Sequence, residues 1–493
     1  MRAVPLTPMS FRRPPGLPAM TRHKMSALLA AAGAVVAGLI VVPSAQAAPA
    51  SPGWAPCRDL PAGLECTTVT VPLDYSRPND ETISVAVSRL PSSKPERRRG
   101  VLVLNPGGQG MTALDLPLQL VAQGLPASVR ESYDLIAFDP RGIGRSAPVD
   151  CDLPPDFYVP PPYARDAADV TATAETARRT ARQCAESPTG RMLPHITMVN
   201  VARDVDKIRQ ALGEHRISYL GYSYSTYLGG VYAELFGQHT DRFVLDSVYG
   251  PDGAHAWSRG IAKGFEDRFP DFAGWAAARH DTYGLGATPD AVRATYFEIA
   301  ERLDAAPVNG TNGATFRGNT FAMLFGDAHF PALADMWRGL RSGVPSGQST
   351  ANSAPVWDFS GQLHLFCNDS RWPRDVATYQ RDVERDRVRY PMFGAAASNI
   401  WPCAFWPAPQ PEPVRFSDRG RHNLLLLSNV RDPGTPYADA LRTRATLGKR
   451  ATMVTVNAGG HLAYLYSKNT CADGIATRWL VDGELPRHDT VCR

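Results

Sequence analysis

A serine between small residues lies in the kind of sharp turn where a hydroxyl can act as a nucleophile. Residues 221–225 read Gly-Tyr-Ser-Tyr-Ser, close to the pattern Gly-x-Ser-x-Gly, in which a strand runs directly into a helix and lifts the serine above the sheet. Residues 216–220 have the composition of a short strand, and residues 226–236 that of a helix. The pattern alone also occurs by chance in buried turns. Its strand–turn–helix setting predicts that Ser223 is a nucleophile.

An aspartate and a histidine follow two later strand-like runs. Asp432 comes after the apolar run 423–428, and His461 follows the run 451–456 and two glycines. The order Ser, Asp, His along the chain is that of an α/β-hydrolase triad. In such a triad His461 would accept the proton of Ser223, and Asp432 would orient the imidazole and stabilise its charged form. Taken singly, Asp432 fits a turn residue that bonds its own backbone, and His461 an ordinary core or surface histidine.

An oxyanion hole would need backbone N–H groups close to the nucleophile. One donor is expected from the residue after the serine, Tyr224. The other is expected from the loop after the early strand 100–105, where residues 106–110 read Pro-Gly-Gly-Gln-Gly. Glycines let the main chain approach a substrate closely, so we predict Gly108 as this donor. A plain glycine-rich turn would have the same composition.

A second glycine pattern competes with this interpretation. Residues 142–147 (Gly-Ile-Gly-Arg-Ser-Ala) match the fingerprint G-x-G-x-x-A of dinucleotide-binding folds. Pro148 and the proline-containing segment 150–155 follow, so no helix is expected to open there, and without a helix N-terminus a pyrophosphate has no site. The sequence contains no C-x-x-C pair and no H-E-x-x-H motif, which argues against zinc. We therefore expect neither a cofactor nor a metal.

The elements that must position these residues alternate along the chain. Segment 100–250 alternates strand-like and helix-like stretches, which is typical of a parallel sheet between helices. The strand-like runs that return after residue 420 belong to the same sheet, whereas the intervening region is richer in Trp, Phe, Arg and Ala and shows no clear strand. We predict an α/β-hydrolase fold, with a mostly parallel sheet flanked by helices and a mainly helical cap insertion. The predicted domains are a signal peptide (1–47), two parts of the hydrolase core (48–251 and 416–493) and the cap (252–415).

The amino terminus has the layout of a secretory signal. A basic stretch at 22–24 precedes an uncharged apolar run over 26–42, and residues 45–47 (Ala-Gln-Ala) form a small-x-small cleavage site. A membrane anchor is the alternative, but the run is shorter than the roughly 20 residues that a span needs. Residues 1–47 carry five basic residues and no acid, so the formal net charge of +4 falls to −1 without them. A nearly neutral, secreted chain gives no reason to expect nucleic acid or a membrane as a partner, and we expect a monomer.

Composition and cysteines agree with a folded, exported protein. The chain has 493 residues, of which 44% are hydrophobic and 20% charged, so it can bury a large core. Its eight cysteines imply disulfides, because these persist in an oxidising compartment, although free thiols or zinc ligands are alternatives. Short loops are the easiest to close. This favours the pairs Cys57–Cys66, Cys151–Cys184, Cys367–Cys403 and Cys471–Cys492.

Further segments resemble the secreted tripeptidyl aminopeptidases of actinomycetes, within the prolyl-aminopeptidase-like group of α/β-hydrolases. The resemblance extends from about residue 54 to the end and is weakest over 252–360. It implies Ser223, Asp432 and His461 as the triad, with Gly108 and Tyr224 forming the oxyanion hole. The matching stretches are 71–75, 105–110, 139–146, 204–213, 221–229, 432–436, 460–461 and the tail 471–492.

Two positions depart from this family's pattern. Ser225 stands where the family has Gly, and Gln109 stands where it has Pro. Neither change removes a catalytic side chain. Both bear on the geometry of the turn at Ser223 and of the oxyanion hole, so they leave altered or reduced activity open.

The resemblance implies a secreted serine exopeptidase that removes short peptides, expected to be tripeptides, from free amino termini through an acyl-enzyme on Ser223. The insertion would form a lid, and a carboxylate would bind the substrate's α-ammonium group. Two alternatives stay open: a carboxylesterase on the same scaffold, which needs no amine site, and a non-catalytic binding protein in which Ser225 spoils the turn. Candidate amine-binding carboxylates in the insertion are Glu266, Asp267, Asp327 and Asp369, each of which also fits a solvated surface acid.

Overall fold

The computed structural model describes residues 53–493 apart from 109, 155–156, 158–160, 309 and 344–357. The predicted signal peptide, its cleavage site and Gln109 lie outside the described residues. None of the described helices has the length and hydropathy of a transmembrane span.

The described strands form a single sheet of ten, ordered β1-β2-β3-β5-β4-β6-β7-β8-β9-β10. Neighbours from β5 to β10 pair in parallel, whereas β1, β2 and β3 pair antiparallel at one edge. This confirms the predicted, mostly parallel sheet. The strands are β1 (Ala55–Pro56), β2 (Glu65–Pro72), β3 (Thr82–Leu90), β4 (Gly100–Asn105), β5 (Tyr133–Phe138), β6 (Ile217–Tyr222), β7 (Thr240–Asp246), β8 (Leu424–Arg431), β9 (Ala451–Gly459) and β10 (Thr490–Cys492).

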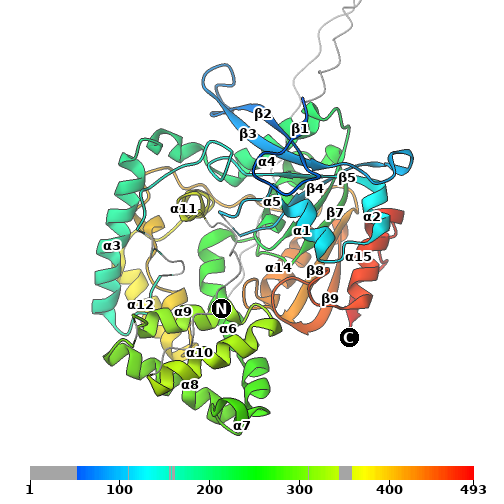
Figure 1. Cartoon of the computed structure of the whole chain (residues 1–493). Helices are drawn as coiled ribbons and strands as arrows, with labels where there is room; N and C mark the ends of the chain where they lie inside the picture. The colour runs from blue at the N-terminus through cyan, green and yellow to red at the C-terminus, as the bar shows by residue number, and fades with distance from the viewer. Residues whose placement is uncertain (1–52, 109, 155–156, 158–160, 309, 344–357) are drawn as a thin grey trace, which may run out of the picture. The chain divides into compact units, whose positions relative to one another are not determined.

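Helices cover both faces of the sheet (Figure 1). They are α1 (Leu116–Ala122), α2 (Ala127–Ser132), α3 (Ala167–Glu186), α4 (Met198–Ala211), α5 (Ser225–Leu235), α6 (Gly253–Ala277), α7 (His280–Tyr283), α8 (Pro289–Ala305), α9 (Gly313–Met323), α10 (Phe330–Ser342), α11 (Phe359–Asn368), α12 (Val376–Arg389), α13 (Gly394–Ala397), α14 (Tyr437–Leu447) and α15 (Thr470–Asp482).

The central strands are largely apolar because both of their faces are buried. Every residue of β4, β5 and β6 is buried. Val101 and Val103 of β4 face one apolar cluster, which includes residues of α4 and α5. Leu102 and Leu104 face the other, with residues of α1 and α15, as the alternation of a strand requires.

All described elements between β7 and β8 are helical, within the interval 252–415 for which the sequence predicts a cap. Aromatic side chains give this region a core of its own, including Phe265 of α6, Tyr296 of α8 and Trp337 of α10. One helix from before the insertion joins it. The sequence assigns α3 to the hydrolase core, but Val170 and Ala174 of α3 pack with residues of the insertion. Part of the apolar face of α3 is therefore buried against the insertion, whereas Ala181 and Cys184 of the same helix belong to the main core cluster.

The structure contains four disulfides, joining the same four pairs that short loops favour. These are Cys57–Cys66, Cys151–Cys184, Cys367–Cys403 and Cys471–Cys492, and no described cysteine is free.

Candidate active site

Ser223 lies in a tight turn between β6 and α5. Its φ of 55° is in the left-handed region, which a serine adopts only when its surroundings impose it. Ser223 is half-buried between fully buried neighbours. The glycine-rich loop packs directly against this turn: a Cβ on Gly107 would lie 2.2 Å from the carbonyl oxygen of Tyr222 and 2.8 Å from Cβ of Ser223. Only glycine fits at position 107, so the loop and the turn are held in contact.

Ser225, the departure from the expected glycine, is accommodated by hydrogen bonds. Its buried Oγ lies 2.9 Å from the carbonyl oxygen of Asn105 and 2.8 Å from that of Tyr222, and its one hydroxyl proton can be donated to either. The side chain of Asn105 accepts a hydrogen bond from the N–H of Gly107 at 3.1 Å. Ser225 therefore connects the turn at Ser223 to the start of the glycine-rich loop.

The two residues predicted to form the oxyanion hole border a common space beside the serine turn. Gly108 and Tyr224 both line a cavity of about 20 Å³, room for roughly one water molecule. The N–H of Tyr224 lies at the start of α5, where the first N–H groups of a helix have no acceptor within it. The Tyr224 side chain is buried and donates a hydrogen bond to Asp369. This bond holds Tyr224 in place.

Asp432 and His461 are in direct contact. Nδ1 of His461 lies 2.8 Å from Oδ1 and 2.9 Å from Oδ2 of Asp432, whose carboxylate is fully buried. The same carboxylate accepts hydrogen bonds from the N–H groups of Gly434 (2.8 Å) and Thr435 (2.9 Å). Asp432 is thus both a turn residue and the partner of the histidine, and its fixed orientation sets the orientation of the imidazole.

Asp246, at the end of β7, links the serine turn to the histidine loop. Its carbonyl oxygen accepts the N–H of Ser223 at 2.8 Å. Its buried carboxylate accepts the N–H groups of Ala463 (3.0 Å) and Tyr464 (2.7 Å), two and three residues after His461. Burial raises the pKa of Asp246 to about 7. Our sequence interpretation missed this residue, although an acid that ends the apolar run Phe-Val-Leu is a usable signal.

The insertion borders the Asp432 and His461 loops. The carbonyl oxygen of Phe325 accepts the N–H of His461 at 2.7 Å, and the Phe325 ring lies edge-on to the imidazole, with centroids 4.9 Å apart. The indole N–H of Trp257 donates to the carbonyl of Gly434 at 2.7 Å. The insertion thus contacts the Asp432 and His461 loops directly.

Each predicted amine-binding carboxylate already has a partner. Glu266 pairs with Arg293 at 3.0 Å, and Asp267 pairs with Lys263 at 2.6 Å. Asp369 is buried beneath the turn and accepts the N–H of Met198 as well as the Tyr224 hydroxyl, so a substrate amine cannot reach it. Asp327 pairs with Arg268, but its side chain is 76% exposed. It also follows Phe325, which contacts His461, by two residues.

The competing glycine pattern does not open a helix. Residues 142–147 form turns, and the carboxylate of Asp139 fills the space beside them, accepting the N–H of Arg145 at 2.9 Å. A Cβ on Gly144 would lie 2.4 Å from this carboxylate. Within the described residues there is also no group of three His, Cys, Asp or Glu side chains that could hold a metal ion.

Three features together define a serine hydrolase with the α/β-hydrolase fold. They are a parallel sheet between helices, a serine on a strained turn after β6, and an Asp–His pair in contact after β8 and β9. Comparison with known proteins agrees. A family model described as "TAP-like protein" matches residues 390–492. The tripeptidyl aminopeptidase of Streptomyces coelicolor is 32% identical over 477 residues, which cover 92% of this chain and 87% of that protein. The chain therefore belongs to the tripeptidyl aminopeptidase family of α/β-hydrolases and is an enzyme, as the sequence predicts.

Two mycobacterial relatives carry different names. The serine protease Hip1 of Mycobacterium tuberculosis is 29% identical over 513 residues, covering 94% of this chain and 96% of that protein. A protein named carboxylesterase B from the same species is 30% identical over 503 residues, covering 93% of this chain and 94% of that protein. The family thus includes proteins named as peptidases and as an esterase.

Proposed function

We propose that this protein is a secreted serine peptidase that releases tripeptides from the free amino termini of peptides. The observation that carries the proposal is the Asp432–His461 contact at the carboxyl edge of the sheet that also bears the strained Ser223, in a chain of the tripeptidyl aminopeptidase family. Ser223, Asp432 and His461 form the catalytic triad in this proposal.

The proposed reaction has two steps. As Oγ of Ser223 attacks the carbonyl carbon of the scissile bond, Nε2 of His461 takes the hydroxyl proton, and Asp432 stabilises the imidazolium. The carbonyl oxygen becomes an oxyanion that accepts hydrogen bonds from the N–H groups of Gly108 and Tyr224. His461 then gives its proton to the leaving amine, and an acyl-enzyme remains. A water molecule, deprotonated by His461, hydrolyses the acyl-enzyme and restores the serine.

Removal of a fixed number of residues requires recognition of the free α-ammonium group. Asp327 is the candidate we favour, because it is exposed and lies on the insertion two residues from Phe325. Two residues span at most about 7 Å, so Asp327 lies close to the histidine loop. Its pairing with Arg268 would have to be shared with the substrate amine.

The proposed location is extracellular. Four disulfides are compatible with an oxidising compartment, and the predicted signal peptide would direct export. After removal of the signal peptide we propose a monomer that acts on peptides, without a membrane or nucleic acid partner.

The direct test uses the mature protein with a free-amine tripeptidyl anilide, the N-acetylated twin of this substrate, and the variant Ser223→Ala. We expect cleavage of the free-amine substrate only, and loss of cleavage in the variant. If neither substrate is cleaved, the proposal is contradicted.

A carboxylesterase is the second candidate, and the relative named carboxylesterase B favours it. An ester hydrolase has no need of a free amine. Equal cleavage of the two anilides, together with faster hydrolysis of a simple acyl ester, would support the esterase and reject the exopeptidase.

A further inference from the structure

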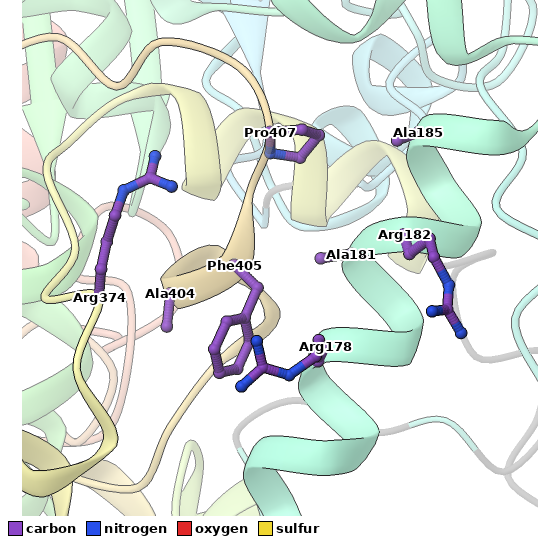
Figure 2. A pocket seen from close by; sticks show the side chains of 8 residues that line it. All are labelled: Arg178, Ala181, Arg182, Ala185, Arg374, Ala404, Phe405 and Pro407. Atoms are coloured by element: carbon purple, nitrogen blue, oxygen red, sulfur yellow. The ribbon is translucent and has the colours of Figure 1, made fainter.

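A second hollow lies on the surface between α3, the short helix η5 (Pro402–Phe405) and the segment that precedes α12 (Figure 2). Its volume is about 480 Å³, within the range of ligand sites. None of its lining residues belongs to the serine turn, the Asp432 loop or the His461 loop. The hollow is therefore separate from the candidate active site.

Three arginines line this hollow without an acidic partner. Arg178 and Arg182 lie one turn apart on α3, and Arg374 lies on the opposite wall. All three are exposed, and none forms an ion pair with a carboxylate of the described residues. Other arginines of this region do form such pairs: Arg165, just before α3, with Asp169 at 2.8 Å, and Arg385 of α12 with Asp382 at 2.8 Å. The hollow thus concentrates positive charge that the protein itself does not neutralise.

The floor between the arginines is apolar, and two of the three arginines have a contact that orients them. The guanidinium of Arg178 stacks over the Phe405 ring, 4.1 Å from its centroid, and Ala181 and Ala404 lie beside this ring. Nη2 of Arg374 donates to the carbonyl oxygen of Trp406 at 3.2 Å. Each guanidinium has five N–H donors, so stacking or a single hydrogen bond leaves donors free for an anion.

Both walls are held by covalent bonds. Cys184 of α3, adjacent to the lining residue Ala185, is bonded to Cys151, and Cys403 of η5, adjacent to Ala404, is bonded to Cys367. A site that is rigid before binding loses less conformational entropy on binding. The helix dipole does not account for these charges, because no basic residue lies in the last turn of α3 and Arg374 lies on a separate segment.

We propose that this hollow is an exosite that binds an acidic segment of a peptide substrate, downstream of the tripeptide that is removed; the inference rests on the proposed peptidase function. Glutamate or aspartate carboxylates would pair with the arginines, and neighbouring apolar side chains would contact Phe405 and the alanines. The apolar floor favours a peptide over a polyphosphate, which has no apolar part to bury.

The binding test uses the mature Ser223→Ala protein, which keeps the peptide intact. The probes are two labelled peptides of about 20 residues, long enough at ~3.3 Å per residue to reach across a domain. In both peptides the amino terminus is free and the first half has no charged side chain. The second half alternates Glu and Phe in one peptide, and Gln and Phe in the other. We expect the Glu peptide to bind at least about tenfold more tightly in fluorescence anisotropy, with an affinity that falls as salt rises.

Replacing Arg178, Arg182 and Arg374 together by Gln should abolish the preference for the Glu peptide. The matched control replaces three other exposed arginines outside the hollow, Arg179, Arg381 and Arg415, and removes the same net charge. The control should shift the affinity by less than about twofold. Equal affinity for the two peptides, or an equal loss in both triple variants, would overturn the exosite. Displacement of the Glu peptide by pyrophosphate as effectively as by unlabelled peptide would also overturn it, in favour of a general anion site.

A kinetic measurement separates this inference from the proposed function. With Ser223 intact, the triple variant should cleave the short tripeptidyl anilide like the native enzyme, whereas its KM for the Glu peptide should rise about tenfold with kcat unchanged. If the native enzyme does not cleave the anilide, the peptidase proposal is contradicted, whatever the binding result. Cleavage of the anilide with an unchanged KM for the Glu peptide would contradict only the exosite.

Discussion

At the scale of single residues, the candidate site depends on small groups that bring main-chain segments together. Gly107 lets the glycine-rich loop touch the serine turn, Ser225 bonds to the start of that loop, and Asp246 binds the segment after His461. These residues touch the scaffold of the site rather than a substrate. Their effect on catalysis is therefore expected to be on geometry, and so on kcat.

Ser225→Gly tests whether the departure from the family's glycine harms the turn or supports it. Because Ser225 donates a buried hydrogen bond worth about 1 kcal/mol, we expect kcat for the tripeptidyl anilide to fall about fivefold, with KM nearly unchanged. Ser93→Gly, at an exposed position away from the site, is the control. An increase in kcat would show that Ser225 impairs the turn.

Asp327→Asn tests the proposed amine site. Loss of the carboxylate should raise KM for the free-amine anilide about tenfold and leave hydrolysis of a simple acyl ester unchanged, because only the first substrate carries an ammonium group. Asp335→Asn is the matched control, since Asp335 is another exposed cap carboxylate, paired with Arg338 at 2.6 Å. Equal changes in the two variants would rule out a specific role for Asp327.

At the scale of elements, parallel strands deliver the proposed catalytic groups to one edge of the sheet. The strands β6, β7, β8 and β9 are consecutive neighbours, so the residues that follow them meet there. The insertion then adds contacts from outside. Phe325 touches His461, and Asp369, at the end of α11, accepts the hydroxyl of Tyr224 at the start of α5.

Asp369 makes this junction between cap and core sensitive to pH. Burial raises its pKa from 3.8 to about 7. Below about pH 4 the Asp369 carboxyl is neutral in both the folded and the unfolded chain, so its contribution to the stability of the fold is fully present. This contribution is lost as the pH rises through about 7, because ionisation favours the unfolded chain. Asn does not titrate. We therefore expect the unfolding free energy of the native protein, relative to Asp369→Asn, to fall between about pH 4 and 7 and then level off. A difference that is constant with pH in urea titrations would contradict this assignment.

At the scale of the whole molecule, covalent links join segments that the sheet alone does not hold. The Cys367–Cys403 disulfide closes the longest loop of the four, with a separation of 36 residues, and ties α11 to η5. The Cys471–Cys492 disulfide ties α15 to β10 at the carboxyl end. These links matter most in the unfolded chain, whose entropy they reduce.

Replacing Cys367 and Cys403 by Ala should lower the free energy of unfolding by about 3–4 kcal/mol, as expected for a loop of this length. Guanidinium unfolding of the oxidised native protein and of the double variant measures the difference. The same experiment with Cys57 and Cys66, separated by 9 residues, should give a smaller loss, because a shorter loop restricts the unfolded chain less. A larger loss for the shorter loop would contradict the loop-entropy explanation.

Features that depend on neighbouring residues could be predicted from the sequence. Apolar runs predict β4, β5 and β8, and strand-like composition predicts β6 and β9. The small residues around Ser223 predict the turn, and the chain order of Ser223, Asp432 and His461 predicts the fold. The four disulfide pairs follow from loop length alone.

Only the tertiary structure decided features that join residues far apart in the chain. Asp246 meets Ala463 and Tyr464, and Ser225 meets Asn105, across separations that no local pattern encodes. For the same reason, the sequence could not show that Asp369 is buried beneath Tyr224 or that α3 packs with the cap. The arginine-lined hollow likewise depends on the packing of α3 against η5. Local patterns specify elements because hydrophobic periodicity and turn chemistry act over a few residues, whereas the partners of a buried polar group are chosen by the packing of the whole chain.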